Sequence, residues 1–186
     1  MSAAAPLRLL AAVLVALAGG LSAAGAQDDD RFMPKGGKTL FLEAAGPSAT
    51  AELREIANVR RSEPEWRDYW SARHKGTSER ELAEIAAYLA VNLPLPEGAV
   101  EQAGTDAASA LPDDGREIAW NGCQFCHSLY SGYLMQQRDV QGWRSVFLSP
   151  FHKNLKLTAQ QRETFARYSA INMPMKPSDV PAALRY

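Results

Sequence analysis

The chain has 186 residues, a length that fits one ordinary domain or two compact ones. Its 20 basic and 21 acidic residues nearly balance, which gives no support for a nucleic-acid partner, since such a partner requires a basic stripe. Only two cysteines are present, both in one Cys-x-x-Cys motif, which excludes an exported protein held together by many disulfides.

Residues 1–26 have the order of a secretory signal peptide. Arg8 supplies positive charge, an apolar run follows from Leu9 to Leu17, and small residues lead to Ala24-Gly25-Ala26. This pattern predicts export to the periplasm, with cleavage after Ala26. The alternative is an uncleaved membrane anchor, but the second half of the segment is Gly, Ser and Ala, too weakly apolar to hold firmly in ~30 Å of hydrocarbon.

The rest of the chain predicts an all-α fold. Apolar residues spaced three and four apart predict a helix from Ser78 to Leu89, and Thr158 begins a similar helix with a capping hydroxyl. No alternation typical of strands extends over a useful length. Between the two helical regions, Pro94 to Asp113 is rich in Pro, Gly, Ala, Ser and Thr and lacks aromatic residues, which is typical of a linker.

Cys123-Gln124-Phe125-Cys126-His127 is the attachment motif of c-type haem. Two thiols three residues apart on a helical turn lie on one side, where they can add to the two haem vinyl groups. His127 follows as the proximal iron ligand. Asp114 and Glu117 form a capping box that begins the preceding helix. The sequence therefore predicts one covalently bound haem c per chain, held by Cys123, Cys126 and His127.

Two other sites could use such a motif. A thioredoxin-like redox pair needs a preceding strand and a βαβ setting, and neither is visible in the sequence. A zinc site needs four ligands, and no second Cys or His pair follows at ligand spacing.

The sixth iron ligand has three candidates in the sequence. Met173 opens Asn172-Met173-Pro174-Met175-Lys176-Pro177, where the prolines would stiffen a loop that presents a thioether. Met173 is the predicted ligand, with Met175 and His152 as alternatives. Met135 lies only eight residues after His127 and is interpreted as a packing residue.

The two halves of the chain resemble each other. Their tryptophans lie 77 residues apart and their Tyr-to-Asn stretches 80 apart, so that a three-residue insertion reconciles them. The matched residues are Gly37 with Gly115, Leu40 with Ile118, Trp66 with Trp143, His74 with His152, Tyr88 with Tyr168, Asn92 with Asn172, and Leu93 with Met173. Leu93, in the half without the cysteines, stands at the place of Met173, so at this place the thioether occurs only in the half that has the haem motif; this supports Met173 as a ligand. His152, by contrast, has a matching histidine, His74, in the half without the motif, which favours a structural role for His152.

The second half, Gly115 to about Pro177, resembles class I c-type cytochromes. The residues that carry this resemblance are Gly115, Cys123, Cys126, His127-Ser128-Leu129, Gln137-Arg138, Trp143 and the stretch from Tyr168 to Pro174. The segment is most similar to small cytochrome subunits or domains that accept electrons from periplasmic dehydrogenases, such as molybdenum sulfite dehydrogenases and quinohaemoproteins. In these relatives a Met often stands a few residues after the Trp, where this chain has Ser149-Pro150-Phe151-His152.

Together these patterns predict two tandem domains with the cytochrome c fold. Residues 31–97 form a cytochrome-like domain that has lost its haem, 98–112 are a linker, and 113–186 form the haem-bearing domain. The predicted function is single-electron transfer between a periplasmic redox enzyme and a respiratory acceptor protein, without catalysis. The alternative is a haem enzyme or gas-binding protein with a labile sixth ligand, for which His152 could serve as the distal acid-base group. The first half could also dock a dehydrogenase.

Overall fold

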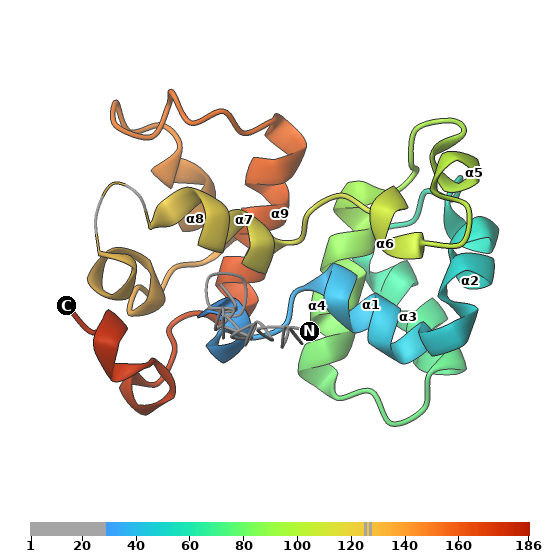
Figure 1. Cartoon of the computed structure of the whole chain (residues 1–186), viewed down its shortest axis with the longest axis horizontal. Coiled ribbons are helices and arrows are strands. Elements are labelled where there is room, and N and C mark those ends of the chain that lie inside the picture. The colour runs from blue at the N-terminus through green and yellow to red at the C-terminus, as the bar shows by residue number, and fades with distance from the viewer. Residues whose placement is uncertain (1–28, 125, 127) are drawn as a thin grey trace, which may run out of the picture.

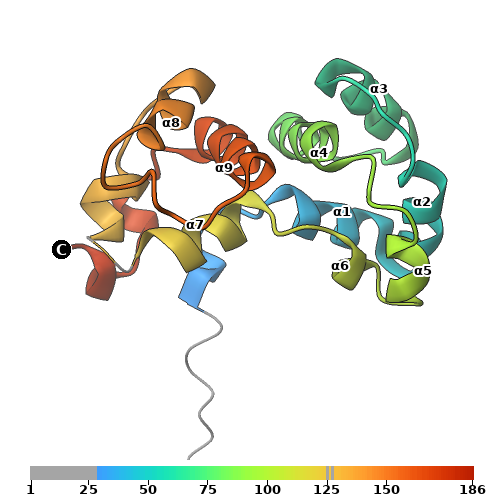
Figure 2. The ribbon, with the colours of Figure 1, turned by 90° about the horizontal axis from the view of Figure 1, so that it is seen from above.

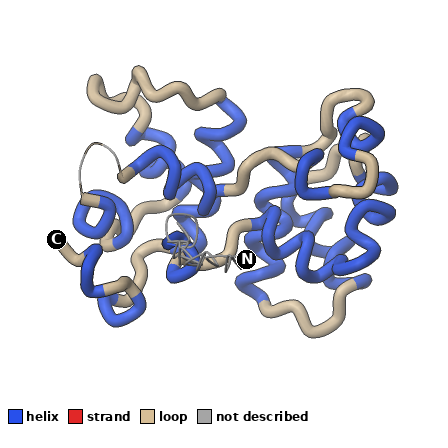
Figure 3. Tube along the Cα trace, in the orientation of Figure 1, coloured by secondary structure: helices blue, strands red, loops and turns tan. Residues whose placement is uncertain are grey.

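The computed structural model describes residues 29–124, 126 and 128–186. The predicted signal peptide, residues 1–26, and the predicted ligand His127 lie outside the described residues. Within the described part every regular element is a helix and no strand occurs, so the all-α prediction is confirmed (Figure 3). None of the helices in these ranges is long and apolar enough to cross a membrane.

The helices form two groups that lie side by side (Figure 1). The first group comprises α1 (Gly37–Ala45), α2 (Ala49–Ile56), α3 (Glu63–Arg73), α4 (Glu79–Asn92), α5 (Ala99–Ala103) and α6 (Ala107–Ala110). The second comprises α7 (Gly115–Cys123), a π-helical turn η3 (Tyr130–Leu134), α8 (Val140–Val146) and α9 (Ala159–Asn172). Short 3-10 turns occur at η1 (Asp29–Phe32), η2 (Gly46–Ser48), η4 (Pro177–Asp179) and η5 (Ala182–Leu184).

Capping boxes fix where the main helices begin. The side chains of Ser78 and Thr158 each accept a hydrogen bond from the backbone N–H three residues later. In return, the side chains of Glu81 and Gln161 accept a hydrogen bond from the backbone N–H of the cap residue. These bonds satisfy N–H groups that a helix leaves unpaired at its start. The predicted box of Asp114 with Glu117 is also present, at the start of α7.

Each group of helices has its own hydrophobic core. The first core contains buried side chains from Leu40 to Leu111, including Trp66 and Trp70. The second contains side chains from Ile118 to Val180, including Trp143 and Phe165, together with Met33. Four aromatic residues, Trp66, Trp70, Trp143 and Phe147, are all buried in these cores.

The segment predicted as a linker, residues 98–112, is more ordered than its composition indicates. It forms α5 and α6, and Val100, Ala107 and Leu111 are buried in the first core. Alanine has the highest helix propensity, and Asp106 accepts a hydrogen bond from the Ala108 backbone N–H at the start of α6. The small residues that look like linker composition therefore serve helix formation and close packing.

The segment that precedes α1 packs on the second group, and the segment that precedes α7 packs on the first. Residues 29–34 pack on the second group, where Met33 is buried and the Tyr168 hydroxyl donates to the Pro34 carbonyl at 2.7 Å. Residues 107–112 pack on the first group, where Leu111 is buried and the Tyr88 hydroxyl donates to the Pro112 carbonyl at 2.6 Å. These two segments tie each group to the other.

Helices α4 and α9 form the centre of the interface (Figure 2). The Asn92 amide donates to the Thr164 hydroxyl at 3.1 Å, and the Asn172 amide donates to the Glu84 carboxyl at 2.9 Å. The Gln160 side chain donates to the side-chain oxygen Oδ1 of Asn92, and the Arg80 guanidinium donates to Oδ1 of Asn172. Each contact therefore recurs with its partners shifted by 80 residues, the offset found in the sequence.

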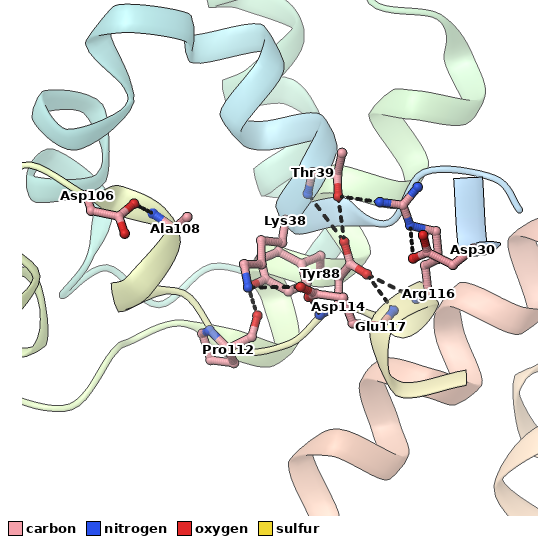
Figure 4. A network of polar contacts seen from close by, with 10 residues as sticks. All are labelled: Asp30, Lys38, Thr39, Tyr88, Asp106, Ala108, Pro112, Asp114, Arg116 and Glu117. Atoms are coloured by element: carbon pink, nitrogen blue, oxygen red, sulfur yellow. Dashed lines mark hydrogen bonds and ion pairs between the residues drawn. The ribbon is translucent and has the colours of Figure 1, made fainter. Parts of the chain in front are cut away.

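Asp114 joins the first helix of each group (Figure 4). One carboxylate oxygen accepts from the backbone N–H groups of Arg116 and Glu117 in α7. The other accepts from the backbone N–H and hydroxyl of Thr39 in α1, both at 3.3 Å. One buried carboxylate thus satisfies N-terminal donors of two helices, and its negative charge suits the positive ends of both helix dipoles.

A glycine permits close packing of α1 against α4 in the first group and of α7 against α9 in the second. A Cβ atom on Gly115 would lie 2.0 Å from the Cβ of Tyr168, and one on Gly37 would lie 2.2 Å from the Cβ of Tyr88. Real Cβ atoms essentially never approach below 3.0 Å. These positions therefore exclude any residue with a side chain unless the helices move apart.

We predict that Gly115→Ala and Gly37→Ala each destabilise the protein by about 1–3 kcal/mol, because the added methyl group overpacks the contact with tyrosine. Gly122→Ala is the matched control in α7, and all variants are compared as haem-free protein because Gly122 lines the cavity described below. Apart from its chain neighbours and its own helix backbone, no atom of the described residues lies within 4 Å of its Cβ position. Urea unfolding of the purified chain measures the effect. Equal stability of Gly115→Ala and Gly122→Ala would contradict this packing.

Glu84 generates a second prediction. Burial, and then the nearby Asp114 carboxylate, raise its pKa to about 8, although hydrogen bonds from Asn172 and the Gly37 backbone act to lower it. A carboxyl whose pKa is raised on folding contributes stability below its unfolded pKa and loses it as the pH rises through its folded pKa. Wild-type stability should therefore fall between about pH 4.5 and 8, by at most about 1.4 kcal/mol per pH unit from this group.

Glu84→Gln keeps an acceptor for Asn172 but cannot ionise. Its free energy of unfolding should match that of wild type near pH 4.5 and exceed it above pH 8. The exposed residue Glu101 provides the control Glu101→Gln, which should follow the wild-type profile. Parallel profiles of Glu84→Gln and wild type from pH 4.5 to 9 would refute the prediction.

Candidate functional site

The two cysteines lie at and just after the C-terminal end of α7. Cys123 is the last residue of the helix and packs partly buried against the second core, and Cys126 is exposed. Both are free thiols. Burial, and then the neighbouring Cys126, raise the pKa of Cys123 to about 12, so its thiol is protonated at neutral pH. The predicted proximal ligand His127 lies outside the described residues.

Both cysteines line a cavity of about 560 Å³ within the second group of helices. Its wall is formed by the end of α7, the η3 turn, α8, the segment that connects α8 to α9, and one residue of α9. The lining residues are Gly122, Cys123, Cys126, Gly132, Tyr133, Arg138, Trp143, Ser145, Val146, Phe147, Ser149, Phe151, His152, Leu155 and Phe165. The volume lies within the range of roughly 300–1,000 Å³ that is typical of sites for small molecules and cofactors.

Five of the fifteen lining residues are aromatic. Among them, Tyr133, Trp143 and Phe165 pack on one another with ring centroids 5.3–5.8 Å apart. The Arg138 guanidinium lies 5.6 Å from the centroid of the Trp143 ring. The cavity thus combines apolar faces with one cation.

The equivalent region of the first group contains larger side chains. Phe41 stands at the place of Ala119, and Trp70 at the place of Phe147. Phe41 and Trp70 are both fully buried, and their ring centroids lie 5.2 Å apart. His74 stacks on Trp70 at 4.1 Å. The first group therefore has larger side chains at these two positions, and its own cavity of about 500 Å³ lies elsewhere, lined by Leu40 and His74 among others.

His152 is half-buried and lines the cavity together with the cysteines. Its ring nitrogen Nδ1 lies 3.1 Å from the Val146 carbonyl oxygen. Because a carbonyl oxygen can only accept, Nδ1 carries the proton in this hydrogen bond. In the neutral ring Nε2 is then the unprotonated nitrogen, which is the form that can bind a metal.

Met173 and Met175 are buried in the second core, and neither belongs to the described residues that line the cavity. Their counterparts Leu93 and Leu95 are buried in the first core. Met173 is 5% exposed and Leu93 3%. The structure therefore does not bring Met173 to the cavity wall with the cysteines, and ligation by Met173 stays a prediction from the sequence. Met135, interpreted from the sequence as a packing residue, packs against the same core.

Sequence reasoning missed most of the cavity wall. Arg138 and Trp143 belong to the matched or resembling residues, but Tyr133, Phe165 and Leu155 carry no motif. Their spacing along the chain gives no signal, since the wall forms only when α8 and α9 pack against the π-helical turn.

Comparisons of the chain with protein-family models, with curated proteins and with solved structures found no match. Among the described residues no group of three or more His, Cys, Asp or Glu side chains could by itself hold a metal ion.

A haem fits the residues present at this site. Two thiols at one wall suit covalent attachment, and the aromatic rings suit the faces of a porphyrin. The Arg138 guanidinium, which lines the cavity, suits the carboxylates that a haem carries.

Proposed function

We propose that this chain is a periplasmic electron-transfer protein that carries one covalently attached haem c and is not itself an enzyme. The observation that carries the proposal is that Cys123 and Cys126, in the Cys-x-x-Cys-His motif, line an aromatic cavity of cofactor size. The apolar wall supports a bound prosthetic group, since such a wall would otherwise face an empty cavity.

The residues have separate roles in this proposal. Cys123 and Cys126 form the thioether bonds, and His127 is the proximal ligand. When bound, haem supplies an iron that changes between the ferric and ferrous states. The aromatic side chains would exclude water and thereby set the polarity around the group, while Arg138 is suited to hold its carboxylates.

The transfer moves one electron and no atoms. A reduced periplasmic redox enzyme donates the electron, and an oxidised respiratory protein accepts it. Phe151 lines the cavity and is 89% exposed, and Cys126 is also exposed, so the cavity wall reaches the molecular surface. Such an opening supports close approach of a partner to the bound group.

We further propose that the two groups of helices are tandem cytochrome-like domains of which the first has lost its haem. The support is the recurrence of contacts at constant offsets: Gly37 on Tyr88 and Gly115 on Tyr168, and the asparagine contacts of α4 and α9. Ala45 to Ala49 stand where the second half has the haem motif, and the larger Phe41 and Trp70 stand at the places of Ala119 and Phe147. The first domain then serves to support, and to dock, the second.

Absorption spectra of the exported full-length protein in both oxidation states test the function. We expect one haem per chain and a six-coordinate, low-spin iron in each state, because an electron carrier keeps both axial positions filled. Ala45 and Ser48, which match the cysteines, offer control sites in the first half: substituting Ser48→Ala should leave the spectra unchanged, whereas Cys126→Ser should remove a thioether bond.

Two results would overturn the proposal. Wild-type protein that contains no haem after expression with a haem-attachment system would remove the cofactor. A five-coordinate, high-spin ferric spectrum would instead favour the haem enzyme or gas-binding protein with an open sixth position.

A further inference from the structure

The nature of the second axial ligand determines the redox behaviour of the site, and the structure distinguishes between the candidates. We infer that His152, and not Met173 or Met175, binds the iron opposite His127, so that the iron has two imidazole ligands. This inference rests on the proposed haem at Cys123 and Cys126.

The first argument is position. Of the three candidates, only His152 belongs to the described residues that line the cavity with the two cysteines. It lies in the segment between α8 and α9, after Ser149 and Phe151, which line the same cavity. The segment that follows α8 therefore brings His152 to the cavity wall.

The second argument is the orientation of the ring. The hydrogen bond from Nδ1 to the Val146 carbonyl oxygen, at 3.1 Å, selects the tautomer with an unprotonated Nε2. A hydrogen bond from the other ring nitrogen to a backbone carbonyl is the arrangement that orients most metal-binding histidines. The backbone of α8 thus prepares His152 as a ligand.

The third argument concerns the methionines. The Met175 backbone N–H donates to the Leu134 carbonyl at 2.9 Å, and the Leu95 N–H donates to the Ala57 carbonyl at 2.8 Å. The segments that contain Met173 and Leu93 thus follow the same backbone path. Both side chains are buried in their cores, so Met173 occupies a packing position that a leucine fills equally well.

His74 is held through Nε2 by a carboxylate, whereas His152 is held through Nδ1 by a backbone carbonyl. His74 Nε2 lies 2.7 Å from the Glu52 carboxylate, and the ring stacks on Trp70. At the place of Trp70 the second half has Phe147, which packs on Phe165 with ring centroids 5.4 Å apart. The nitrogen that pairs with a carboxylate in His74 is the one that the proposal assigns to iron in His152.

Ligand variants of the exported, haem-loaded full-length chain test this inference. Met173→Leu introduces the residue of the first half and should leave the low-spin spectrum and the reduction potential unchanged. His152→Ala should convert the ferric iron to a high-spin form and let the ferrous form bind carbon monoxide. Added imidazole should restore the low-spin spectrum of His152→Ala, which a merely structural defect would not allow.

A measurement on the wild type keeps the inference testable if His152→Ala does not accumulate. The ferric near-infrared spectrum should show charge transfer typical of two imidazole ligands, without the thioether-to-iron band. His152→Met should produce that band and raise the potential, since bis-histidine iron has the lower potential of the two. A thioether band in wild type, lost in Met173→Leu or Met175→Leu, would overturn the assignment while leaving the haem proposal intact; absence of haem would overturn both.

Discussion

The contact between Gly115 and Tyr168 is the constraint on which the site depends. Because Gly115 has no Cβ, α7 packs directly against the Cβ and ring base of Tyr168 in α9. The hydroxyl of the same tyrosine donates to the Pro34 carbonyl. This contact fixes the helix that ends in Cys123 relative to the helix that carries Phe165. Since Cys123 and Phe165 both line the cavity, this contact helps to position two elements of the cavity wall.

The same constraint occurs twice, and the two copies differ in what fills the space beside it. In the first group, Phe41 packs on Trp70, and His74 stacks on Trp70. In the second, the smaller residues Ala119 and Phe147 stand at the places of Phe41 and Trp70, and a cavity lies next to the cysteines. We propose that a covalently bound porphyrin occupies this cavity.

The interface between the groups is specific because it is polar and buried. Asp114 caps α1 and α7 together, and Asn92 and Asn172 join α4 to α9. Leaving any of these groups unpaired would cost about 1–3 kcal/mol, which selects one arrangement of the two halves. The buried carboxyl of Glu84 makes that arrangement sensitive to pH.

Local signals in the sequence predict the helices well, because capping boxes and apolar spacing act within a few residues: Ser78, Asp114 and Thr158 begin helices as expected. The packing of residues 29–34 and 107–112 on the neighbouring groups could not be predicted, since no local pattern indicates which core receives Met33 and which receives Leu111. The alanine-rich segment resembles a linker for the same reason that it packs well, namely its small side chains. The position of His152 in the wall depends on how the segment between α8 and α9 folds back, which no periodicity encodes.

The central claim is that the cavity beside Cys123 and Cys126 holds one covalent haem. Peptide mass spectrometry of the exported protein tests it most directly. We predict that the peptide spanning residues 117–138 carries the mass of one haem, joined to both cysteine sulfurs, and that no other peptide does. A disulfide between the two cysteines, or two free thiols in protein expressed with a haem-attachment system, would contradict the account.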